Sequence, residues 1–106
     1  MSEIVFSEIV QAVCRHFGIV CDYAKQKICI EQIGLRDSNL VYLLTDWQQA
    51  QSTARFLLSD FELRHKMPDI WKAHCEQSQA TLDAARAKLV SYCLENKIAT
   101  REIMQL

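Results

Sequence analysis

The sequence predicts an all-α protein, and three observations lead to this expectation. Two glycines and one proline in 106 residues are far below the average usage of roughly 7% and 5%. An all-β chain needs a turn roughly every 8–12 residues, which so few helix and strand breakers do not supply. Half of the residues are hydrophobic, and along most of the chain they recur at intervals of three and four. We therefore expect one compact bundle of five or six helices that forms a single domain, residues 1–106.

The first expected helix runs from about Glu3 to Phe17. Its apolar side chains share one face, and they are Phe6, Ile9, Val10, Val13 and Phe17. Gly18 follows at the position where a helix C-cap glycine belongs. A second segment begins at Asp22, which suits an N-cap, and Gly34 closes it. Ile28, Cys29, Ile30 and Ile33 also fit a short strand, so the second segment is open to both interpretations.

The longest expected helix covers about Asn39 to Glu62, with Asp37 or Ser38 as its cap. Apolar and small residues recur along it at threes and fours, namely Leu40, Leu43, Leu44, Trp47, Ala50, Ala54, Leu57, Leu58 and Phe61. This pattern is typical of a central core helix. Near the end of the chain, Thr100 is expected to cap a last helical turn or two.

The segment from about Met67 to Lys88 predicts a helix-turn-helix. Pro68 suits the first position of a helix that we expect to end near Cys75. A polar break follows over residues 76–78, and a further helix begins at Gln77 or Ser78 and continues to about Asn96. The remaining requirements of the motif are met by Ile70 and Ala73 in the first helix and by Leu82 in the second.

The stretch from Ala54 to Leu89 resembles the C-terminal DNA-binding domain of the bacterial replication initiator DnaA, a member of the Trp-repressor-like helix-turn-helix group. The resemblance is carried by residues 54–58, by the run Met67 to Ala73, and by residues 80–82 and 86–89. Residues 9–19 are similar to the opening helix of that domain. Of the family's base-reading pattern, only Thr81 matches, and no nucleotide-binding loop is present. The resemblance implies the fold and a role in DNA binding, as in replication or transcription regulation.

The leading function expected from the sequence is therefore a small regulator that binds double-stranded DNA, of a kind carried by phages or plasmids. Gln79 and Thr81 are the expected base contacts. Arg64, Lys66 and Lys72 are the expected phosphate contacts, and the remaining candidate DNA-binding residues are Gln77 and Ser78. The alternative is a non-enzymatic adaptor or inhibitor that binds a partner protein on the same scaffold. The turn Glu76-Gln77-Ser78-Gln79 favours this alternative, because it lacks basic residues.

Enzymatic and metal-dependent functions are not expected. The chain shows no catalytic triad, phosphate loop or pair of catalytic carboxylates, and we expect no cofactor. The five cysteines show no Cys-x-x-Cys spacing, so we expect free thiols in the reducing cytoplasm. His65, His74 and Cys75 come nearest to a metal-ligand set, and they do not make one. We expect no secretory signal, because the first residues lack a basic stretch followed by an apolar run. We also expect no membrane span, because the longest apolar run is too short for one.

Self-association is expected, because helix-turn-helix proteins commonly bind DNA as dimers. The formal net charge of −1 offers little electrostatic opposition to pairing. We expect a homodimer with the N-terminal helix or residues 98–106 at its interface. Trp71, Ile103 and Leu106 are the candidate interface residues, and the open alternative is that Ile103 and Leu106 pack on the central helix of their own chain.

Overall fold

The structure is a computed structural model that describes residues 6–106, so the expected start of the first helix at Glu3 lies outside the described residues. Six α-helices and one 3₁₀-helix form within this range. They are α1 (Phe6–Phe17), η1 (Tyr23–Lys25), α2 (Gln26–Arg36), α3 (Ser38–Leu58), α4 (Phe61–Lys66), α5 (Pro68–Glu95) and α6 (Thr100–Ile103). No strand occurs among the described residues. The predicted all-α bundle is confirmed.

Local side-chain chemistry sets the ends of the first elements. Gly18 has a φ of 71°, the left-handed conformation expected of a C-cap glycine. The Asp22 carboxylate accepts a hydrogen bond from the Ala24 amide at 3.0 Å and caps η1. The predicted closure of the second segment at Gly34 is wrong, and so is its strand interpretation. One glycine inside a helix costs only about 0.5–1 kcal/mol, so α2 continues to Arg36.

Asp37 separates α2 from α3. Its backbone is extended, and its side chain accepts a hydrogen bond from the Leu40 amide at 3.1 Å, which makes it the N-cap of α3. At the other end, α3 stops at Leu58, short of the predicted Glu62. Asp60 is responsible, because its carboxylate accepts from the Leu63 amide at 3.1 Å and begins a new helix. Side chains of this type compete with a continuing helix for backbone groups.

The hydrophobic core lies at one end of the molecule. It joins α1, α2, the first half of α3, the last third of α5, and α6. The side chains with no exposed surface in it are Ile9, Val10, Val13, Cys14, Ile33, Leu40, Leu44, Leu89 and Cys93. We call this part the base. In the described range, no helix combines the length and the apolar character that crossing a membrane requires.

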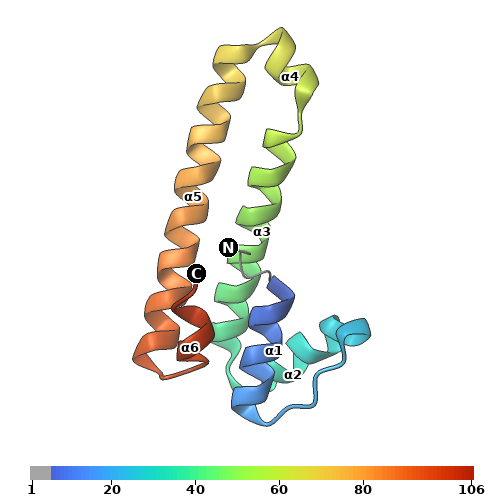
Figure 1. Ribbon diagram of the computed structural model, residues 1–106, viewed down its shortest axis with the longest axis vertical. Coiled ribbons are helices and arrows are strands. Elements are labelled where there is room, and N and C mark those ends of the chain that lie inside the picture. Colours follow the sequence, from blue (N-terminus) through green and yellow to red (C-terminus); the bar gives the residue numbers. More distant parts are fainter. Residues whose placement is uncertain (1–5) are drawn as a thin grey trace.

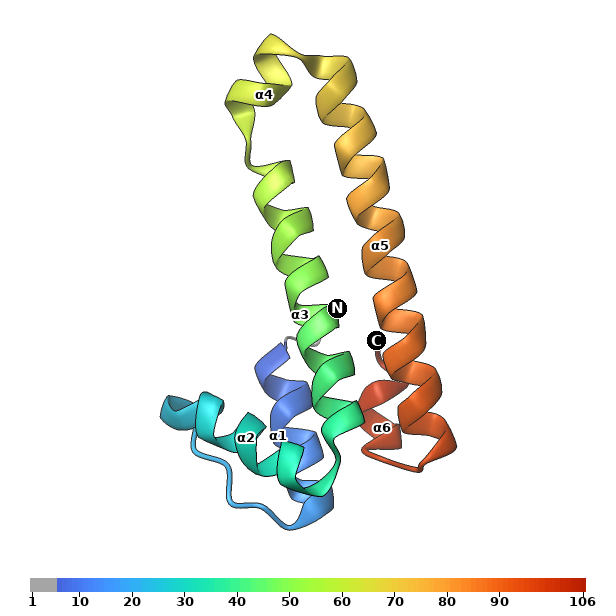
Figure 2. The ribbon, with the colours of Figure 1, turned by 180° about the vertical axis from the view of Figure 1, so that it is seen from behind.

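A long helical hairpin projects from the base. α3 and α5 run side by side along the whole length of the molecule, and α4 forms the bend between them (Figure 1). The reverse view shows α1, α2 and α6 gathered around the lower end of this pair (Figure 2). The radius of gyration is 15.6 Å and the extents are 49 × 29 × 28 Å, whereas a compact domain of this length has a radius of about 13 Å. The hairpin therefore makes the fold elongated.

A hydrogen bond between two distant parts of the chain ties the hairpin to the base. The Tyr92 hydroxyl on α5 donates to the Asp37 carboxylate at 2.6 Å. Asp37 thus holds the first turn of α3 with one oxygen and α5 with the other. The hydrogen bond and partial burial raise the pKa of Tyr92 to about 12.

Replacing Asp37 by Ala removes both contacts. An N-cap is worth about 1 kcal/mol and a hydrogen bond to a charged group about 1.5–3 kcal/mol. We expect the free energy of unfolding, measured by urea titration, to fall by roughly 2.5–4 kcal/mol. Tyr92→Phe removes only the second contact and serves as the partial control. Equal losses in the two variants would show that Asp37 does not act as a cap.

The Tyr92 contact also predicts a pH dependence. The pKa of Tyr92 is raised from 10 to about 12 in the folded chain, so the folded state holds this proton more tightly than the unfolded state. The resulting stabilisation is present below about pH 10 and is lost as the pH rises through about 12. The stability difference between the wild type and Tyr92→Phe is expected to shrink over this range. A difference that stays constant from pH 9 to pH 12 would contradict the assignment.

Candidate interaction surface

The predicted helix-turn-helix is wrong, because α5 continues through the expected turn. The helix runs unbroken from Pro68 to Glu95, and the residues of the expected break, 76–78, lie within it. Pro68 does begin the helix, as predicted. No glycine or proline follows until the end of α5, and glutamine and serine inside a helix cost only a few tenths of a kcal/mol, roughly 0.3–0.5 relative to alanine.

The side chains expected to read DNA bases instead make contacts along α5. The Ser78 hydroxyl donates to the Cys75 carbonyl at 3.0 Å and so caps no helix. The Thr81 hydroxyl donates to the Gln77 carbonyl, also at 3.0 Å. The side-chain amide of Gln79 donates to the Asp83 carboxylate at 3.0 Å. These three side chains find their hydrogen-bond partners within one turn of the same helix. They therefore do not belong to a separate recognition helix.

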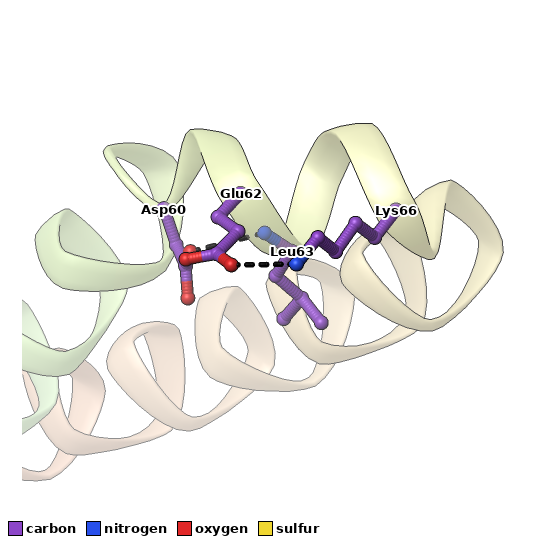
Figure 3. Close-up of polar contacts among 4 residues, drawn as sticks. All are labelled: Asp60, Glu62, Leu63 and Lys66. Atoms are coloured by element: carbon purple, nitrogen blue, oxygen red, sulfur yellow. Dashed lines mark hydrogen bonds and ion pairs between the residues drawn. The ribbon is translucent and has the colours of Figure 1, made fainter.

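The three basic residues expected to contact phosphate lie around the bend of the hairpin. Lys66 forms an ion pair with Glu62 at 2.8 Å, and Figure 3 shows this pair beside the cap bond from the Leu63 amide to Asp60. The Arg64 guanidinium lies 5.0 Å from the centre of the Trp71 ring. Lys72 is exposed on the first turns of α5. Between residues 55 and 72 the chain carries four basic and three acidic side chains, so the bend is not a basic surface.

The outer half of the hairpin has no core of its own. We call residues 55–84 the distal hairpin. The structure describes all of these residues, and none of them is buried. The last buried side chain on α3 is Ala54, and the first on α5 is Ala85. Helices in proteins owe most of their stability to packing of an apolar face, and here that packing is incomplete.

Large apolar side chains are exposed around the bend. Phe61 is 69% exposed and Phe56 is 68% exposed. The remaining exposed members of this group are Leu58, Met67 and Ile70. Contiguous exposed apolar patches mark interaction sites in soluble proteins. Aromatic side chains and methionine are also enriched in protein interfaces.

Two grooves follow the contact between α3 and α5. The first has a volume of about 420 Å³ and is lined by Asp46, Gln49, Ala50, Thr53 and Leu57 of α3 and by His74, Gln77, Ser78 and Thr81 of α5. The second has a volume of about 290 Å³ and is lined by Trp47, Gln51, Ala54, Arg55 and Leu58, by Gln79, Leu82 and Arg86, and by Gln105 and Leu106. The two linings lie on neighbouring stripes of α3. The grooves therefore flank the helix pair on its two sides.

Trp71 closes the hairpin near its bend. Its indole Nε1 donates to the Leu57 carbonyl at 2.7 Å, across the gap between α5 and α3. This carbonyl belongs to the last turn of α3, where carbonyl groups lack a partner within the helix. Trp71 is half-buried, and Arg64 covers its ring. Its role as an interface anchor stays a prediction, whereas its contacts within the chain are clear.

The predicted dimer interface at the chain ends is wrong in its main residues. Ile103 is 1% exposed and Ile98 is 4% exposed, so both belong to the base. The apolar face of α1 is buried in the same core. Leu106 is half-buried and packs against this core. The open alternative, in which Ile103 and Leu106 pack on the central helix of their own chain, is correct in that both pack within their own chain. The helix α6, however, makes its main contacts with α5 and α1 rather than with α3.

Three cysteines that sequence spacing did not connect lie together in the base. The Sγ atoms of Cys14, Cys21 and Cys29 all lie within 4.8 Å of one another. Burial raises the pKa of Cys14 to about 12, with a further contribution from the other two thiols, and burial also raises the pKa of Cys21. The residues are seven and eight positions apart, so no short motif marks them. The signal lay in the turn formed by Gly18 and Asp22, which folds α2 back onto α1.

Replacing Trp71 by Phe keeps the aromatic ring and removes the bond to Leu57. A typical hydrogen bond contributes about 1 kcal/mol, so the distal hairpin should open about fivefold more often. Amide hydrogen exchange of the residues around the bend is the measurement. Arg64→Met, which removes the cation over the ring, serves as the comparison. Exchange at the bend that is unchanged in Trp71→Phe would show that the indole bond does not hold the hairpin closed.

No protein-family model, curated protein or solved structure matches the chain. The resemblance to the DnaA C-terminal domain therefore stays a prediction from the sequence.

Proposed function

We propose that this chain is a non-enzymatic protein-interaction module that self-associates through its distal hairpin. The observation that carries this proposal is the absence of any buried side chain over residues 55–84, all of which are described. Over the same range the chain keeps an ordered helical hairpin with five large apolar side chains exposed. A second chain that covers this surface supplies the missing core.

The geometry favours another helical hairpin as the occupant. Two helices do not enclose a core, whereas four helices packed at a small angle do, and this is a common arrangement for helical hairpins. The grooves on the two sides of α3 and α5 offer the depressions into which side chains of such a neighbour pack. A second copy of this chain brings a hairpin of the required length.

The charge pattern also favours a second copy over an anionic partner. In a two-fold symmetric dimer, each side of the interface meets the same surface of the other chain. A surface that carries both signs can complement itself, and the distal hairpin carries Asp60, Glu62 and Asp69 among its basic residues. DNA and anionic lipid require a basic stripe or cluster. The DNA hypothesis has also lost the recognition helix on which its base contacts depended.

The self-association proposal predicts a dimer in light scattering at high micromolar concentration. Burying a phenylalanine is worth about 1.5–3 kcal/mol, so Phe61→Ser should raise the dimer dissociation constant at least about tenfold. Ile70→Ser should act in the same direction. Leu35→Ser is the matched control, because Leu35 is 87% exposed on α2, outside the distal hairpin. A wild type that runs as a monomer, or a control variant that dissociates equally, would overturn the proposal.

A titration with DNA separates the two functions expected from the sequence. The measurement is fluorescence anisotropy with a mixed-sequence duplex at two salt concentrations. We expect no salt-dependent binding of the duplex. Phosphate contacts necessarily give such a dependence. Binding that weakens with salt would instead support the DNA-binding regulator, if Lys72→Ala lowers the slope of log affinity against log salt concentration by about one unit.

A further inference from the structure

We propose that Cys14, Cys21 and Cys29 form a three-thiolate site for a soft metal ion, Zn²⁺ or Cu⁺. The three side chains come from the C-terminal half of α1, from the segment before η1, and from α2. Every pair of their sulfur atoms lies within 4.8 Å. Cysteine is often a small apolar core residue, and Cys93 illustrates this role in the base. A role as small core residues does not by itself explain why three thiols lie together.

The distances are close to those of a metal site. A metal–sulfur bond of about 2.3 Å places the sulfur atoms about 3.8–4.0 Å apart in tetrahedral or trigonal coordination. The observed limit of 4.8 Å therefore needs a contraction of less than about 1 Å. When the ion binds, each sulfur loses its proton to solvent and forms one bond to the metal.

The ligand set selects the kind of ion. In the described part of the chain, the group contains three thiols and no imidazole or carboxylate. Soft thiolates favour Zn²⁺ and Cu⁺, whereas Mg²⁺ and Ca²⁺ require oxygen ligands. Three protein ligands leave Zn²⁺ one position for water or an added ligand, and they complete a trigonal site for Cu⁺.

The surroundings provide both shielding and access. Cys14 and Cys29 are buried, and Cys21 is half-buried at the edge of the base. The Cys29 thiol lies 3.9 Å from the Asp22 carbonyl, as a weak sulfur hydrogen bond. An ion therefore enters past Cys21 and is held on the inner side by two buried sulfurs. Its binding would join α1, α2 and the segment between them.

The first experiment uses Co²⁺ and Zn²⁺ on the full chain in its reduced form. Co²⁺ added without oxygen is expected to give sulfur-to-cobalt charge-transfer bands that saturate at one ion per chain, and Zn²⁺ should remove them. Cu⁺ competition against a chromophoric chelator tests the second ion in the same sample. Cys21→Ser, the variant with the least buried position, should weaken binding at least about 100-fold, more than loss of an outer-shell partner. Cys75→Ser, which removes a half-buried thiol on α5, should leave binding unchanged.

The second experiment needs no variant and so does not depend on folding of a mutant. Alkylation of the native chain followed by peptide mapping measures each thiol with and without Zn²⁺ or Cu⁺. The ion should slow alkylation of Cys21 at least about tenfold and leave Cys75 unaffected. No charge-transfer bands and no protection of Cys21 with any of these ions would overturn the proposal. Equal loss of binding in Cys75→Ser would also overturn it.

Discussion

The contact between the first half of α3 and the last third of α5 is the constraint on which the rest of the fold depends. Leu44 and Trp47 on α3 and Leu89 and Cys93 on α5 are buried in the shared core. α1, α2 and α6 pack around this pair and cover its lower end. The hairpin is therefore anchored at one end, and its outer half depends on helix propensity and on the Trp71 bond.

This division places the buried residues and the exposed apolar residues in different halves of the same two helices. The base contains the buried residues that a small domain needs for stability, including Ile98 and Ile103 in the C-terminal segment. The distal hairpin contains apolar residues that the fold leaves exposed, with Phe56 and Phe61 the most exposed of them. Exposed apolar surface of this kind promotes association between proteins.

The sequence was informative where a single residue sets the local backbone. Gly18, Asp22, Asp37 and Pro68 all lie at the element ends that their chemistry predicts. It was misleading at residues 76–78, where polar residues that suit a turn are also tolerated in a helix. The local sequence does not distinguish a turn from a continuous helix at these residues, because the outcome depends on the pairing of α5 with α3.

The candidate sites were harder to predict for a similar reason. Exposure of Phe61 follows from the early end of α3, and that end depends on the cap formed by Asp60. The core face expected along the long helix extended to Phe61, whereas the last buried side chain on α3 is Ala54. The thiol group depends on the fold of α2 against α1, which brings together residues that no short motif connects.

The uninterrupted course of α5 also has a mechanical consequence. A helix of 28 residues is about 42 Å long, and α5 has no glycine or proline after its first position to act as a hinge. The helix therefore behaves as a stiff lever with its pivot in the base. A tilt of about 5° at the pivot moves the far end by about 4 Å for a lever of this length. A force applied at the bend would therefore act directly on the side chains around Tyr92 and Cys93.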